Sequence, residues 1–143
     1  METLLNNDLE MRCTQSQFSQ EVKELVKASE QEFIQHCSAL LAEYKPLFSS
    51  KNQRISIDVV KTKTDLFQPG YTSYVSINIE PHKEKYNINI VLPIWRCERK
   101  FLGIPVERNI PGSKTTGTLI KLKNAQAMFR EFIEDNLNKE DLR

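Results

Sequence analysis

The chain has 143 residues and a net charge of +1, with 39% hydrophobic and 27% charged residues. This balance is typical of a globular protein and excludes a disordered, highly charged chain. The length suits one domain over residues 1–143, and no apolar run approaches the roughly 20 residues of a membrane span. We therefore expect a single domain and no membrane-embedded part.

The three cysteines, Cys13, Cys37 and Cys97, are an odd and widely spaced set. The first twelve residues carry acidic side chains and lack the basic start and apolar stretch of a signal peptide. Free thiols in such a chain are typical of the reducing cytoplasm. The sequence therefore predicts a cytoplasmic protein without disulfides.

Residues 1–13 are weakly amphipathic, and we expect a frayed arm or a short helix there. Thr14 and Gln17 have the spacing of a capping box, which satisfies free backbone donors at the start of a helix. Apolar side chains then follow at steps of three and four residues and predict one long helix, Phe18–Tyr44, that Pro46 ends. Its stripe comprises Phe18, Val22, Leu25, Val26, Ser29, Phe33, Cys37, Leu40, Leu41 and Tyr44.

The length of this helix has a structural consequence. From Thr14 to Tyr44 it would be roughly 46 Å long, at about 1.5 Å per residue. A compact domain of this size is only about 37 Å across. The helix therefore either breaks, for which Ser29 is the candidate position, or projects past the sheet. A projecting apolar stripe requires a second chain, which predicts a homodimer through Phe18–Tyr44.

The stretch 72–97 shows the period-two alternation of a β-hairpin. The apolar residues hold odd positions in its first arm, as at Ile79, and even positions in its second arm, as at Ile88. Residues opposite each other in an antiparallel pair share a face. Ile79 therefore lies opposite either Ile88, with a turn at 82–85, or Tyr86, with a longer loop.

The alternation lapses after Ile90, because Val91 and Trp95 put apolar side chains on the nominally outer face. Both faces of the sheet are then expected to be covered at this end. The cover is either a helix, since large side chains usually serve packing, or a partner or ligand.

Further segments extend the hairpin into a sheet. Residues 55–60 alternate as a first strand and residues 118–122 as a last one. Residues 102–106 also alternate, but Pro105 cannot donate to a sheet ladder, which predicts an edge strand or a bulged strand. A turn-rich loop is expected at 110–117.

A last amphipathic stretch predicts a C-terminal helix that Asn124 caps. Its apolar residues are Ala125, Met128, Phe129, Phe132, Ile133 and Leu137. A run of strands flanked by helices favours an α+β fold. We predict a long N-terminal helix and a C-terminal helix packed on a four- to five-stranded antiparallel, meander-like sheet.

Charge is segregated along the chain. Residues 1–44 carry three basic and eight acidic side chains, residues 45–123 fourteen and six, and residues 124–143 three and five. Acidic helices therefore enclose a basic sheet. This arrangement favours docking of the helices on the sheet, and it would also attract an anionic partner to the solvent face.

The candidate contact surface combines basic and aromatic side chains near the end of the hairpin. It comprises Trp95, Arg96, Arg99, Lys100, Phe101 and Arg108. We predict a non-enzymatic binding or regulatory protein that makes macromolecular contacts through this surface. Such a cluster also suits stacking on bases and contact with phosphates, so a nucleic-acid-binding domain is the first alternative. The pI of about 7.7 weighs against it, because such domains are usually strongly basic.

A second alternative is a small-ligand or catalytic pocket between helix and sheet. Its polar groups would be Tyr74, Asn78, Asn89 or Glu107. The two histidines, His36 and His82, have neither nucleophile partners nor metal-ligand spacing around them. We therefore assign no catalytic residue, no metal site and no cofactor.

Overall fold

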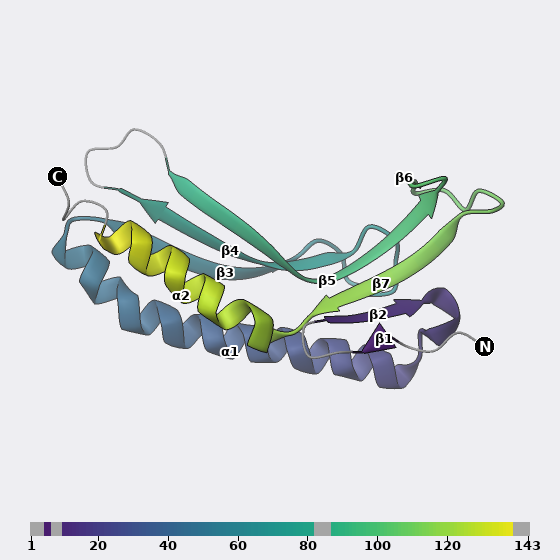
Figure 1. The fold of residues 1–143 in the computed structure, drawn as a ribbon, viewed down its shortest axis with the longest axis horizontal. Coiled ribbons are helices and arrows are strands. Elements are labelled where there is room, and N and C mark those ends of the chain that lie inside the picture. The colour runs from purple at the N-terminus through teal and green to yellow at the C-terminus, as the bar shows by residue number, and fades with distance from the viewer. Residues whose placement is uncertain (1–4, 7–9, 82–86, 139–143) are drawn as a thin grey trace.

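A computed structural model describes residues 5–6, 10–81 and 87–138. Two α-helices pack on one face of an antiparallel sheet, which is the predicted α+β arrangement (Figure 1). The strands are β1 (Leu5–Asn6), β2 (Glu10–Thr14), β3 (Arg54–Lys61), β4 (Thr72–Glu80), β5 (Ile88–Phe101), β6 (Ile104–Pro105) and β7 (Lys114–Ile120). The helices are α1 (Gln20–Ser50) and α2 (Leu122–Asn138), and a 3-10 turn, η1 (Gln15–Gln17), precedes α1.

The strands follow the order β1-β2-β7-β5-β4-β3, with β6 paired to β5 beside this path. Strands β3, β4 and β5 form the predicted meander. The second half of β5 pairs on its other side with β7, and β7 pairs with β2. The sheet therefore pairs a strand from near the start of the sequence, β2, with one from its last third, β7.

The N-terminal segment differs from the prediction of a frayed arm or a short helix. Residues 10–14 form β2, which pairs with β7 along its whole length. Met11 and Cys13 of β2 are buried in the core. Two inward apolar residues give too little periodicity to distinguish a short strand from an arm. With β1 and β2, the five predicted strands become seven.

Of the two predicted hairpin registers, the structure has the one that places Ile79 opposite Ile88. The turn predicted at 82–85 lies outside the described residues. The odd positions of β4, from Ser73 to Ile79, are all buried against the helices.

A β-bulge in the β4–β5 pair changes which residues of β5 face the core. Ser73 lies opposite Trp95 and Tyr74 opposite Pro93, so Ile94 is the extra residue. The extra residue reverses the alternation. Up to Ile94 the even positions of β5 face the helices, and from Trp95 onward the odd positions do.

Trp95 is wholly buried as a result. Its indole Nε1–H donates a hydrogen bond of 2.7 Å to the carbonyl of Leu66. The rings of Phe18 and Phe67 pack against it, with centroids 6.2 and 6.4 Å away. Packing by the chain itself therefore explains this apolar residue, whereas Val91 stays half exposed on the outer face.

Helix α1 is continuous, so the predicted break near Ser29 is absent. Ser19 is its N-cap and accepts a hydrogen bond of 3.2 Å from the amide of Val22. The predicted capping box exists, since Gln17 accepts from the amide of Thr14 at 2.8 Å, but it opens η1 rather than α1.

Pro46 lies inside α1 and does not end it, contrary to the prediction. Proline removes one helix donor and crowds the carbonyl four residues earlier, here that of Ala42. Both residues are exposed, so water can solvate this carbonyl. The helix continues because Phe48, half a turn further, is wholly buried in the core. Burial of this ring offsets the unfavourable proline.

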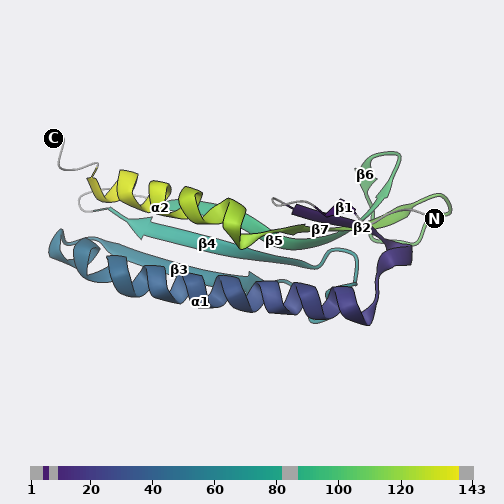
Figure 2. The same cartoon turned by 60° about the horizontal axis from the view of Figure 1, so that its bottom comes forward.

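The molecule is elongated rather than compact, which resolves the question of helix length. The 14 residues of β5 span roughly 46 Å at about 3.3 Å each, as does α1. Figure 2 shows α1 running along nearly the whole sheet. Its buried residues are Val22, Val26, Glu30, Phe33, Cys37, Leu40, Tyr44 and Phe48. Most of the predicted stripe is thus covered within one chain, with Leu25 left exposed, and a dimer through α1 stays an untested prediction.

The end of the chain departs from the prediction in two places. Strand β7 begins at Lys114, within the expected loop at 110–117. The prediction missed this start because the inward residues Thr115 and Gly117 are not apolar enough to show the alternation of a strand. Helix α2 begins at Leu122, so Asn124 is not its cap. The segment before β7 contains β6, a two-residue edge strand of the kind that Pro105 predicted.

Helix α2 packs beside α1 through rings and a charged cluster. Phe33 and Phe129 meet edge to face, with centroids 6.2 Å apart. Tyr44 donates a hydrogen bond of 2.6 Å to Glu134 and accepts one of 2.8 Å from Arg130. Neither α1 nor α2 combines the length and the apolar character needed to cross a membrane.

Candidate functional site

The helices leave one face of the sheet uncovered, and we call it the open face (Figure 1). On β4 it carries the even positions from Thr72 to Glu80, and on β5, after the bulge, it carries Arg96, Glu98 and Lys100. Figure 1 shows both ends of β5 curving away from α1, so the open face is concave.

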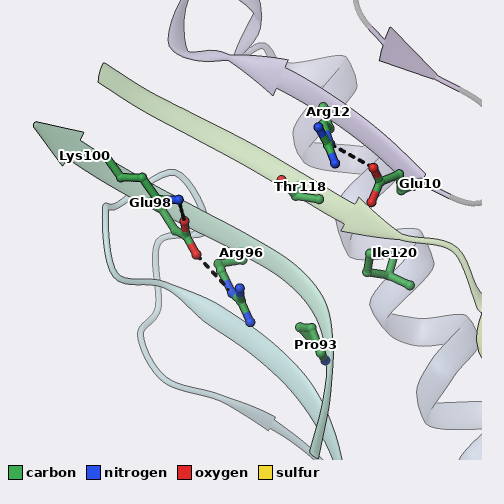
Figure 3. Close-up of a pocket in the computed structure, with 8 residues that line it drawn as sticks. All are labelled: Glu10, Arg12, Pro93, Arg96, Glu98, Lys100, Thr118 and Ile120. Atoms are coloured by element: carbon green, nitrogen blue, oxygen red, sulfur yellow. Dashed lines mark ion pairs between the residues drawn. The ribbon is translucent and has the colours of Figure 1, made fainter. Parts of the chain in front are cut away.

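A hollow of about 440 Å³ lies on the open face where β2, β7 and β5 run side by side (Figure 3). We call it the basic hollow, and its lining residues are Glu10, Arg12, Pro93, Arg96, Glu98, Lys100, Thr118 and Ile120. Three of these side chains are basic and two are acidic. The hollow therefore joins β2, near the start of the sequence, to strands β5 and β7, whose lining residues come about 80 or more positions later.

Arg12 and Arg96 lie on the two sides of Thr118. The register places Arg12 opposite Thr118 in the β2–β7 pair and Arg96 opposite Thr118 in the β5–β7 pair. Neighbouring strands are about 4.8 Å apart, so the two arginine backbones are separated by about 10 Å. Figure 3 shows the two arginines on either side of Thr118, each with its guanidinium group turned to a glutamate of its own strand. Both side chains are exposed and long enough to turn to one anion above the threonine hydroxyl.

Each basic side chain of the hollow forms an ion pair with a glutamate two positions away on its own strand. Nε of Arg12 lies 2.8 Å from Oε1 of Glu10, and Nε of Arg96 lies 3.2 Å from Oε1 of Glu98. Lys100 shares Glu98 through a contact of 3.2 Å. Exposed pairs of this kind add little stability, so their main effect is to orient the cations. In both pairs the contact is made by Nε of the arginine.

Of the predicted contact residues, the structure brings Arg96 and Lys100 together. Arg99 lies on the opposite face of β5, where its Nε donates to Thr115 at 3.3 Å. Its Nη1 donates to the carbonyl of Glu107 at 3.1 Å. Arg99 therefore ties the segment after β6 to the sheet, and it does not line the basic hollow.

The two predicted aromatic residues are also not in the basic hollow. Trp95, expected on the contact surface, is in the core because of the bulge. Phe101 shares the face of Arg99 and packs over Gly112, where an added Cβ would lie 3.4 Å from its ring. Arg108 is exposed in the segment after β6. The lining of the basic hollow therefore contains basic but no aromatic side chains.

Sequence reasoning missed Glu10, Arg12 and Thr118. The signal was present in β2, where Glu10, Arg12 and Thr14 alternate with Met11 and Cys13. This pattern predicts a half-buried strand only if the segment is already known to be extended.

A second hollow of about 400 Å³ adjoins the first, between the start of β4 and β6. Its lining residues are Gly70, Thr72, Arg96, Cys97, Glu98, Arg99, Pro105, Val106 and Glu107. Arg96 and Glu98 line both hollows. An extended ligand can therefore continue from one hollow into the other.

The polar residues that we assigned to a pocket between helix and sheet do not face the helices. Tyr74, Asn78 and Asn89 lie on the open face, and Glu107 lines the second hollow. Between helices and sheet the structure places mainly apolar side chains.

That layer also contains one buried carboxylate, Glu30. It accepts a hydrogen bond of 2.6 Å from Tyr71 and lies 3.8 Å from the ammonium group of Lys61. One carboxylate oxygen of Glu30 accepts from Tyr71 and the other pairs with Lys61, so Glu30 has the partners that a buried structural carboxylate needs.

The nucleophilic side chains lie away from the open face. Burial raises the pKa of Cys13 and Cys37 to about 11 and that of Cys97 to about 12. Protonated, buried thiols are unreactive. Burial, with the charge of Arg130, lowers the pKa of His36. Within the described ranges, no three His, Cys, Asp or Glu side chains gather closely enough to hold a metal ion.

The chain was compared with protein-family models, curated proteins and solved structures. None matches it. The interpretation of the basic hollow therefore rests on its geometry.

Proposed function

We propose that this chain is a non-enzymatic, cytoplasmic binding or regulatory protein that holds an acidic segment of a protein partner in the basic hollow. The observation that carries the proposal is the convergence of Arg12, Arg96 and Lys100 on one concave site of the open face. Carboxylates of a partner would form charge-assisted hydrogen bonds with these cations. The three unpaired cysteines support a reducing compartment.

Two features favour a protein partner over nucleic acid. Surfaces that bind single strands combine cations with exposed rings on which bases stack. The lining of the basic hollow has no aromatic residue. Its three cations are also partly neutralised by Glu10 and Glu98, whereas nucleic-acid binding depends on neutralising several phosphates.

Arg96→Gln should weaken the binding of a fluorescein-labelled hexaglutamate peptide about tenfold, measured by fluorescence anisotropy at low salt. The side chain is half exposed, so the fold should be retained. Arg54→Gln is the matched control, because Arg54 is also on the open face and lies 3.9 Å from Glu80, at the far edge of the sheet. This control should change the affinity less than twofold.

Equal losses in the two variants would mean that only net charge matters, and no loss in Arg96→Gln would overturn the proposal. A labelled single-stranded oligonucleotide is measured in parallel. If it binds more tightly than the peptide, depends on Arg96 and weakens steeply with salt, the nucleic-acid alternative replaces the proposal.

A further inference from the structure

We propose that the group recognised in the basic hollow is a phosphorylated side chain of the partner, held between Arg12 and Arg96. This inference rests on the proposed function and specifies the chemistry of the acidic segment. It follows from the number and placement of the donors rather than from charge alone.

Two arginines lie on the strands on either side of Thr118. Arg12 and Arg96 flank this residue in register, and all three line the same hollow. A carboxylate is planar, and one arginine can occupy both of its oxygens. A phosphate monoester has three terminal oxygens in a tetrahedral arrangement, so it can bridge two guanidinium groups and also accept from a hydroxyl.

The three cations of the hollow, which outnumber its two glutamates, favour a dianion over a carboxylate. Glu10 and Glu98 lie beside Nε of the arginines and their charges oppose any anion, so a ligand must gain more from the cations than it loses to these carboxylates. A singly charged carboxylate offers the arginines no more than these glutamates already do. A phosphate group carries about −1.5 to −2 charges at pH 7 and has more to gain from Arg12, Arg96 and Lys100 together.

The rest of the lining suits a peptide. Pro93 and Ile120 give the hollow an apolar border, which can pack against a side chain next to the phosphorylated residue. Arg96 and Glu98 continue into the second hollow, where Pro105 and Val106 add further apolar surface. Recognition of a phosphorylated segment by arginines beside such surface is a recurring mode of peptide binding.

The test uses three nonapeptides that differ only at a central residue, which is phosphoserine, glutamate or serine. Titration calorimetry at physiological salt and pH 7.5 should show the phosphoserine peptide binding at least tenfold more tightly than the glutamate peptide. The serine peptide should bind weakest. Below pH about 6, where the phosphate gains a proton, binding of the phosphoserine peptide should weaken, while the glutamate peptide changes less.

Arg12→Lys and Arg96→Lys keep the charge but remove the guanidinium fork. Each should weaken the phosphoserine peptide about tenfold and the glutamate peptide less than threefold. Arg54→Lys, at the far edge of the open face, should change neither affinity.

The outcomes separate this inference from the proposed function. If the glutamate peptide binds as tightly as the phosphoserine peptide, the inference fails and the proposed function stands. If neither peptide depends on Arg96, both fail. If inorganic phosphate or a 5′-phosphorylated oligonucleotide binds more tightly than the phosphoserine peptide, a phosphorylated protein segment is not the ligand, and the inference is overturned.

Discussion

Gly117→Ala is expected to destabilise the protein by about 3 kcal/mol or more, because the new methyl group has no space. A Cβ at this position would lie 2.0 Å from Cη2 and 2.5 Å from Cζ2 of Trp95. The indole cannot move aside without losing its hydrogen bond to Leu66 and its contact with Phe18. Either β7 must separate from β5 or the ring must leave the core.

Gly103→Ala is the matched control. An added Cβ there meets no atom within 4 Å, but the residue has a φ of +81°. We expect a loss of only about 1 kcal/mol from this backbone strain. Urea unfolding, followed by the fluorescence of the single tryptophan, measures both variants. If Gly117→Ala is as stable as Gly103→Ala, Trp95 does not pack on β7.

Raising the pH from 9 to about 11 is expected to unfold the protein cooperatively. In the folded state, burial raises the pKa of Cys13 and Cys37 to about 11 and of Cys97 to about 12, from an ordinary value near 9. The unfolded chain therefore loses three protons in a range where the folded chain keeps them. Stability is unaffected below pH 9 and then falls by up to about 4 kcal/mol per pH unit.

Two tyrosines act in the same direction at higher pH. Burial, with the hydrogen bond to Glu134, raises the pKa of Tyr44 to about 12, and burial beside Glu30 also raises that of Tyr71. Chemical denaturation at pH 8, 9, 10 and 10.5 measures the slope, under reducing conditions. Replacing Cys37 by alanine should reduce the slope by about a third. A stability that is constant up to pH 10.5 would mean that the thiols are not buried.

The helices and the hairpin could be predicted because their signals repeat. Helix α1 carries its stripe over many turns, and the opposite parity of Ile79 and Ile88 defines the register of the hairpin without reference to any other strand. Helix ends were less predictable. Pro46 predicts the end of the helix, but α1 continues to Ser50 because Phe48 is buried in the core.

The candidate site was predicted only in part because a single bulge decides its composition. Without the extra residue at Ile94, the even positions of β5 would continue to face the core, and Arg96 and Lys100 would point inward. The bulge reverses this order, so Trp95 enters the core while the two cations reach the open face. Arg99 holds an odd position of β5, whereas Arg96 and Lys100 hold even ones. This difference alone predicts that Arg99 lies on the other face of the strand.

The sequence did not predict Arg12 as a site residue for a different reason. Arg12 contributes to the basic hollow only because β2 pairs with β7, more than 100 residues later in the chain. Such a pairing depends on the assembled sheet, and a five-residue strand carries little local signal for it. The sequence thus indicated a basic surface near the end of β5, and the fold decides which cations form it.

The central claim is that the open face binds an acidic ligand at the basic hollow, and amide chemical-shift mapping tests it most directly. The uniformly ¹⁵N-labelled protein is titrated with the phosphoserine nonapeptide at physiological salt. We predict that the largest shifts fall on Arg12, Arg96 and Thr118, with small shifts along α1 and at Arg54. Largest shifts on α1 or α2, or none at saturating peptide, would contradict the assignment of the open face as the binding surface.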